Sequence, residues 1–185
     1  MKKWSEIKQA TLDKLFLDEQ EAQQQGYLAK FQGFANECLN MISNGIKPRI
    51  ATYEVTTTKE NSTILMPDDF LSFADMIGYC NGVPDPTLIY IDDKRIIAPE
   101  AGNYVLFYNA LWHDITRDDI VDDVELNIDY SVLNCLPTYI AAQCLGQDDV
   151  QRSAILKNEF ELLLARLDTN IMYESNHFKS NGGWY

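Results

Sequence analysis

The amino-acid sequence predicts an α+β fold that is mainly helical, with a four-helix bundle-like core and an inserted small antiparallel β-sheet. Apolar residues recur at helical spacing towards both ends of the chain. Between residues 50 and 108 the pattern changes to short alternating segments rich in β-branched residues. The 185 residues suit one domain, since a domain takes about 100 to 200 residues. A single domain over 1–185 is therefore expected.

The first part of the chain predicts helices within 4–45. The Gln-rich stretch up to Gln25 is a polar helix or a linker. Residues 27–44 keep a wide apolar stripe on one helical face, and Asn44-Gly45 closes that helix with a residue able to adopt positive φ. A shorter helix over 4–17 is indicated by the apolar residues Trp4, Ile7, Leu12, Leu15 and Phe16.

Pro48 ends the helical pattern and opens a β-rich insert over 50–108. Strands are expected over 50–58 and 104–108, and a hairpin over 88–98 turns at Asp92-Asp93-Lys94. Pro67 is followed by two aspartates, a pattern typical of a helix start. It predicts a short helix over 70–77.

Two closing helices are expected within 130–172. Pro137 starts the regular part of the first or kinks it, and Gly146 is placed for its C-terminal cap. Asp148 or Asp149 then caps a long last helix. Residues 174–185 lose the periodicity and form a C-terminal arm. The apolar stripe of the last helix comprises Val150, Ala154, Phe160, Leu163, Leu164, Leu167 and Ile171.

The net charge, the cysteines and the apolar runs argue against nucleic-acid binding, disulfide bonds and a membrane span. A formal net charge of -13 opposes binding to a phosphate backbone, which depends on Lys and Arg. The four cysteines are far apart in sequence and lie among apolar neighbours, which predicts reduced and mostly buried thiols. No apolar run approaches the roughly 20 residues of a membrane helix. We expect a soluble protein made in the cytoplasm, with no membrane partner.

The sequence lacks the usual signatures of catalysis. It contains no Gly-x-Ser-x-Gly, Gly-x-x-x-x-Gly-Lys or Gly-x-Gly-x-x-Gly motif. Five Asp-Asp pairs could in principle hold a divalent metal, but each has a structural explanation as a turn, a helix start, a helix cap or part of an exposed acidic connection. The prediction is a protein that is not an enzyme and holds no cofactor or metal.

Two sets of residues are candidates for contacts with partners. The aromatic pair after the double glycine is a good anchor for a partner's pocket, although a frayed end explains it equally well. The stretch 114–129 is a solvated loop by default, or the negative lining of a passage. The docking candidates are Gly182, Gly183, Trp184 and Tyr185, and the acidic candidates are Asp118, Asp119, Asp122 and Asp123.

The layout of several segments resembles the head-tail connector, or neck adaptor, family of tailed bacteriophages. The similarity covers about residues 27–173 and lies in the order of the segments, which are 66–70 (MPDDF), 104–108 (YVLFY), 112–116 (WHDIT), 136–142 (LPTYIAA) and 148–161.

The resemblance implies a virion protein that assembles in the host cytoplasm into a homo-oligomeric ring, usually of twelve copies. That ring would bind the portal protein and an adjacent neck or tail protein, and DNA would pass through it without specific binding. A terminal segment often docks on the neighbouring ring in this family, which would be the role of Gly182 to Tyr185 here. The alternatives are a stopper or tail terminator, both dominated by β structure, or a small cytoplasmic enzyme or ligand-binding domain.

Overall fold

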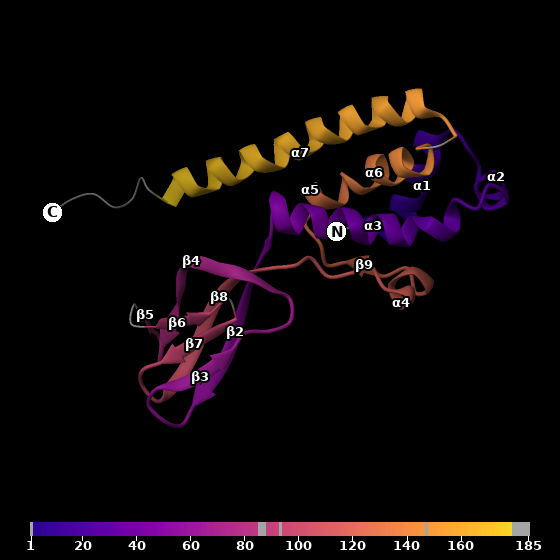
Figure 1. Ribbon diagram of the computed structural model, residues 1–185. Coiled ribbons are helices and arrows are strands. Elements are labelled where there is room, and N and C mark those ends of the chain that lie inside the picture. The colour runs from indigo at the N-terminus through magenta and orange to yellow at the C-terminus, as the bar shows by residue number, and fades with distance from the viewer. Residues whose placement is uncertain (1, 85–87, 93, 147, 179–185) are drawn as a thin grey trace. The chain divides into compact units, whose positions relative to one another are not determined.

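The computed structural model describes residues 2–84, 88–92, 94–146 and 148–178 (Figure 1). The chain predicted as one domain divides into two compact units. The helical unit comprises the described residues of Met1–Lys47 and His113–Tyr185, and the β unit comprises those of Pro48–Trp112. The chain therefore leaves the helical unit at Lys47, completes the β unit, and returns at His113.

The helical unit is organised around one short helix that is apolar on every side. Helix α6 (Leu136–Cys144) is buried at every residue except Gln143, as expected for a helix without a polar face. It contacts α1 (Trp4–Leu15), α3 (Leu28–Gly45), α5 (Tyr130–Leu133) and α7 (Val150–Phe178). The other elements of this unit are α2 (Glu19–Gln24), α4 (Arg117–Val121) and the antiparallel pair β1 (Lys2–Lys3) and β9 (Glu125–Leu126).

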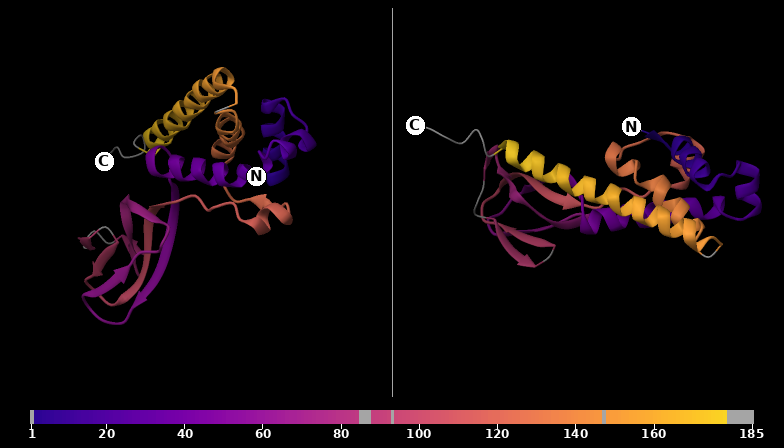
Figure 2. Two further views of the ribbon diagram at one scale, coloured as in Figure 1. Left: turned by 45° about the vertical axis from the view of Figure 1, so that its right-hand side comes forward. Right: turned by 90° about the horizontal axis from the view of Figure 1, so that it is seen from above.

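Helix α7 packs along α6 and extends well beyond it, as the views in Figure 2 show. Its buried residues in the described part include Leu156, Phe160 and Leu167, and the Phe160 ring lies 5.0 Å from that of Tyr139 on α6. Asp149 caps the helix, because its Oδ1 accepts the backbone N–H of Arg152 at 3.0 Å. Asp148 instead accepts the hydroxyl of Tyr27.

The β unit contains two antiparallel sheets. The larger has the strand order β2-β8-β4-β5 and the smaller the order β3-β7-β6. Strands β2 and β8 pair at nine consecutive positions without a shift, whereas β4 shifts register between Phe73 and Gly78. The strands are β2 (Arg49–Thr57), β3 (Ser62–Leu65), β4 (Phe70–Cys80), β5 (Val83–Pro84), β6 (Ile89–Asp92), β7 (Arg95–Ala98) and β8 (Gly102–Ala110).

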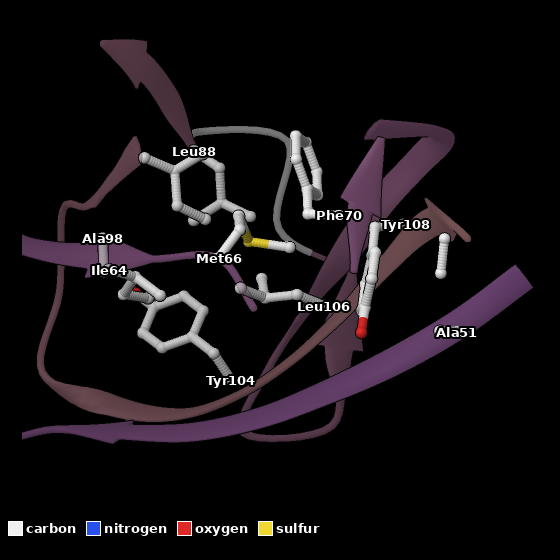
Figure 3. Packing of buried hydrophobic residues seen from close by; sticks show 11 residues of the cluster. Ala51, Ile64, Met66, Phe70, Leu88, Ala98, Tyr104, Leu106 and Tyr108 are labelled. Carbon is white, nitrogen blue, oxygen red and sulfur yellow. The ribbon is translucent and has the colours of Figure 1, made fainter. Parts of the chain in front are cut away.

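This unit has a hydrophobic core of its own. Side chains from both sheets meet there, and Figure 3 shows Met66 and Leu106 pointing into the space between the strands. Alternate residues of β8 are buried, which is the pattern of a strand with one covered face. The cluster comprises Ala51, Ile64, Met66, Phe70, Leu88, Ile96, Ala98, Tyr104, Leu106, Tyr108 and Ala110.

The predicted fold class is wrong in its proportions. Helix makes up 46% of the chain and strand 27%, so the fold is α+β and not a mainly helical bundle with a small inserted sheet. The strands form two sheets that enclose a separate core, and a small insert would have none. The helices also differ from four equal amphipathic partners, because α6 is apolar on every side and α1, α3, α5 and α7 pack against it.

Two local predictions need correction. The short helix predicted over 70–77 is part of strand β4. Its two aspartates precede a strand, and Asp69 serves a tertiary contact, accepting hydrogen bonds from Arg49 and from the hydroxyl of Tyr108. In the last helix, Val150 and Ala154 were placed on the buried stripe, but both are exposed. Leu156 takes their place in the core.

Candidate functional site

A surface groove lies in the helical unit between the end of α1 and the start of α7. It encloses about 510 Å³. We call it the α1–α7 groove, and its lining residues are Asp13, Lys14, Phe16, Arg152, Ile155, Leu156 and Glu159. Both helices belong to the helical unit, so the groove lies within one compact part of the chain.

Phe16 forms one wall of the α1–α7 groove and ends helix α1. Its backbone is left-handed, with φ 57° and ψ 39°, and its N–H bonds back to the carbonyl of Asp13 at 3.3 Å. Glycine is the usual residue at such a cap because a side chain is disfavoured at positive φ. The Phe16 side chain is nevertheless 82% exposed. An exposed aromatic ring thus occupies a position where the fold itself favours glycine.

Arg152 fixes the geometry of the α1–α7 groove. Its Nη2 donates to the carbonyl oxygens of Lys14 and Leu15 at 3.1 and 3.2 Å, groups that the end of α1 leaves without helical partners. The guanidinium carbon lies 4.9 Å from the centre of the Phe16 ring, within the range of a cation–π contact. One side chain of α7 therefore caps α1 and holds the aromatic wall in place.

The rim of the groove is charged but balanced. Lys14 Nζ lies 2.7 Å from Glu159 Oε1, and this ion pair joins α1 to α7 a second time. Asp13 adds a second carboxylate and Arg152 a second cation, so the four charges cancel. The groove is neutral on a chain whose net charge is -13.

Apolar surface continues from the groove along α7. Ile155 is 60% exposed and Leu162, seven residues further along the helix, is 65% exposed. A spacing of seven residues places both on the same side of a helix. Val150 is exposed as well. Part of α7 therefore presents large apolar side chains to solvent in the isolated chain.

The acidic candidates lie at and just after helix α4, where they have different surroundings. Asp119 forms a capping box with Thr116, whose backbone N–H it accepts at 2.8 Å, and these hydrogen bonds lower the pKa of Asp119. Asp123 accepts the backbone N–H and hydroxyl of Ser5, both at 2.9 Å, which likewise lowers its pKa. Asp118 and Asp122 are exposed.

The other candidate residues and the Asp-Asp pairs have mixed outcomes. Gly182, Gly183, Trp184 and Tyr185 lie outside the described residues. Asp92 serves the predicted hairpin turn, accepting the backbone N–H of Lys94 at 3.1 Å. The stretch expected to be an exposed connection contains helix α4 and strand β9. Within the described part of the chain, no three His, Cys, Asp or Glu side chains gather where they could hold a metal ion.

The α1–α7 groove was missed from the sequence. From the sequence, Phe16 is counted among the apolar residues that indicate the first helix, and Ile155 and Leu162 are not on the predicted stripe of the last helix. One local signal exists: Leu15, Phe16 and Leu17 are consecutive apolar residues, and one helical face cannot bury all three. No local signal connects Phe16 with Ile155, because the two segments are far apart in sequence.

No family model matches the chain, and no curated protein sequence matches it. Among the described helices, none is both long enough and apolar enough to span a membrane.

Proposed function

We propose that the chain is a structural subunit of the head-tail connector of a tailed bacteriophage, a ring that joins the capsid portal to the tail and surrounds the DNA channel. The observation that carries the proposal is the α1–α7 groove together with the exposed apolar residues of α7. Surfaces of this kind become buried when subunits associate. A connector subunit has to associate with other subunits, and this role needs no catalytic step and no cofactor.

The balance of helix and strand supports the connector over the other neck proteins. Stoppers and tail terminators are dominated by β structure, whereas this chain is 46% helix and 27% strand. Two of the segments that carry the resemblance are 136–142, which lies in α6, and 148–161, which spans the start of α7. These two helices pack against each other in the helical unit.

The charge of the chain supports a passage for DNA that does not bind it. With 28 acidic and 15 basic residues, the protein has little Lys or Arg to neutralise phosphates. The exposed carboxylates of Asp118 and Asp122 would make a channel wall negative, and a negative wall repels the DNA backbone. The acidic set 118, 119, 122 and 123 remains our candidate for that wall.

The test is co-assembly with the portal protein encoded in the same genome. The two proteins are co-expressed and purified through a tag on the portal, and the complex is imaged by electron microscopy. We expect a closed ring of this chain, of about twelve copies, stacked on the portal. A chain that fails to co-purify with the portal, and is absent from purified virions by mass spectrometry, would overturn the proposal.

A further inference from the structure

We propose that the α1–α7 groove receives Trp184 from a neighbouring copy of the same chain. The inference rests on the proposed function, since a ring supplies the neighbour, and it names the contact that links one subunit to the next. The groove offers an apolar floor made by Ile155 and Leu156 and an aromatic wall made by Phe16. An indole ring suits such a site, because it combines a large apolar area with one N–H donor.

The carboxylates at the rim provide the acceptor that the indole N–H requires. Asp13 and Glu159 both line the groove, and the Glu159 side chain is 45% exposed despite its ion pair with Lys14. The Arg152 guanidinium already stacks on Phe16, and an arriving aromatic ring would extend this stack. An indole ring can therefore donate its N–H to one carboxylate of the rim and stack against Phe16 and Arg152.

Charge also favours this occupant. Most surfaces of a chain with net charge -13 repel a second copy. The groove is an exception because its four charges cancel. The segment 175–185 is another, since its only charged side chain is Lys179. The groove and this segment meet without the repulsion that opposes most other contacts between copies.

The length of α7 requires that the segment come from another copy. The helix is continuous from Val150 to Phe178, so Ile155 and Phe178 lie about 35 Å apart along its axis at a rise of about 1.5 Å per residue. The chain from Phe178 to Trp184 extends to at most about 20 Å. Trp184 therefore falls short of Ile155, on the floor of the groove, in its own chain. Such a contact joins two different surfaces of successive copies, so it is a heterologous interface. Heterologous interfaces are the type from which closed rings are built.

The test uses a fluorescent peptide of residues 175–185, titrated into full-length Trp184→Ala protein by fluorescence anisotropy. This acceptor keeps the groove but cannot supply the anchor. We expect saturable binding, and we expect the same peptide with Trp184→Ala to bind about 30-fold more weakly, which is the effect of losing an aromatic hot spot. A peptide that binds equally well without Trp184, or does not saturate at millimolar concentration, overturns the proposal.

Two matched substitutions on α7 locate the site. In the Trp184→Ala background, Ile155→Glu places a charge in the groove and should weaken peptide binding at least tenfold. Ala154→Glu introduces the same charge at the preceding residue of α7, on a different side of the helix and outside the groove, and it should leave binding unchanged. Both residues are exposed, so thermal melts should show that both variants fold. Equal binding by the two variants would overturn the groove as the acceptor.

The failure of this inference is distinguishable from failure of the connector function. If full-length Trp184→Ala protein still forms rings on the portal as the wild type does, the docking inference is wrong and the connector function stands. If the peptide binds the groove as described but the wild-type chain never assembles with the portal, the contact between copies stands and the connector function is wrong.

Discussion

At the scale of single residues, Phe16 combines two unfavourable features. A left-handed backbone costs a residue other than glycine about 1 to 2 kcal/mol, and the Phe16 ring remains mostly exposed to water. Residues held in sparsely populated backbone conformations are concentrated at binding sites. The same residue forms a wall of the α1–α7 groove. Phe16 therefore lies outside the core and belongs to the surface that we propose for assembly.

Replacing Phe16 with glycine should separate stability from assembly. Glycine relieves the positive φ but adds about 0.5 to 1 kcal/mol of backbone entropy cost, and the contact with Arg152 is lost. We expect the free energy of unfolding to stay within about 1 kcal/mol of the wild type, while self-association weakens about tenfold or more. Urea unfolding and sedimentation velocity measure the two quantities.

The comparison for Phe16→Gly is Leu15→Ala, one residue earlier. Leu15 is only 2% exposed, so its truncation should cost about 2 to 5 kcal/mol of stability. If Phe16→Gly destabilised the protein as strongly as Leu15→Ala, Phe16 would belong to the core.

Asp129 should make the stability of the helical unit dependent on pH. Burial would raise the pKa of this carboxyl, but hydrogen bonds from Lys47 Nζ at 2.8 Å and from Ser131 overcome it and lower the pKa to about 2. Because the pKa is depressed in the folded protein, the stabilisation is complete above about pH 4, the value in unfolded chains, and is lost as the pH falls through about 2. Allowing for partial solvent exposure, we expect a contribution of about 1 to 2 kcal/mol.

The measurement compares urea unfolding of wild type and Asp129→Asn between pH 7 and pH 2. Asparagine keeps an acceptor for the N–H of Ser131, at which Asp129 caps α5, but removes the charge. The difference in free energy of unfolding should be largest at neutral pH and should disappear near pH 2. A difference that does not change over this range would show that the Lys47 contact does not depend on the charge of Asp129.

At the scale of elements, two glycines should respond to alanine in opposite directions. A Cβ at Gly78 would lie 2.5 Å from the carbonyl oxygen of Val105, so Gly78→Ala forces the strands β4 and β8 apart and should cost about 1 to 3 kcal/mol. Gly33 lies on α3 with nothing within 4 Å of the added carbon. Gly33→Ala should stabilise the protein by about 0.5 to 1 kcal/mol.

Thermal unfolding of the two variants beside the wild type measures both effects. The two substitutions add the same methyl group, so opposite signs isolate the backbone contact at Gly78. An unchanged melting temperature for Gly78→Ala would mean that the register shift in β4 absorbs the extra carbon.

Local sequence patterns are sufficient to predict those helices and strands in which buried residues recur at a regular spacing. The stripe over 27–44 predicts α3, and alternation predicts β2 and β8. Strand β4 was missed because Pro67 and its two aspartates imitate a helix start, whereas Asp69 binds Arg49 and Tyr108 from other strands. Tertiary partners of this kind leave no local pattern.

The same reason limits prediction of the site. The sequence drew attention to Trp184 because its neighbours are polar and glycine-rich. The groove, by contrast, depends on Phe16 and Arg152 meeting across the fold. Only the packing of α1 and α7 around α6 brings those two residues together.

At the scale of the whole molecule, the two units have separate cores and should unfold with separate responses to mutation. Leu106 in the β unit and Ile140 in the helical unit are both fully buried. Each truncation to alanine should cost its own unit about 2 to 5 kcal/mol. We expect differential scanning calorimetry to resolve two transitions, with Leu106→Ala lowering one and Ile140→Ala lowering the other. A single transition lowered by both variants would show one cooperative unit.

The order of the units along the chain has a consequence for folding during synthesis. The β unit is continuous, while the helical unit is interrupted by it. Helix α3 ends at Gly45, but its partner α6 begins only at Leu136. At a translation rate of about 5 to 20 residues per second, roughly 5 to 20 s pass between the synthesis of α3 and the synthesis of α6. The whole β unit is synthesised within this interval, so it can fold before α6 exists to cover the apolar stripe of α3.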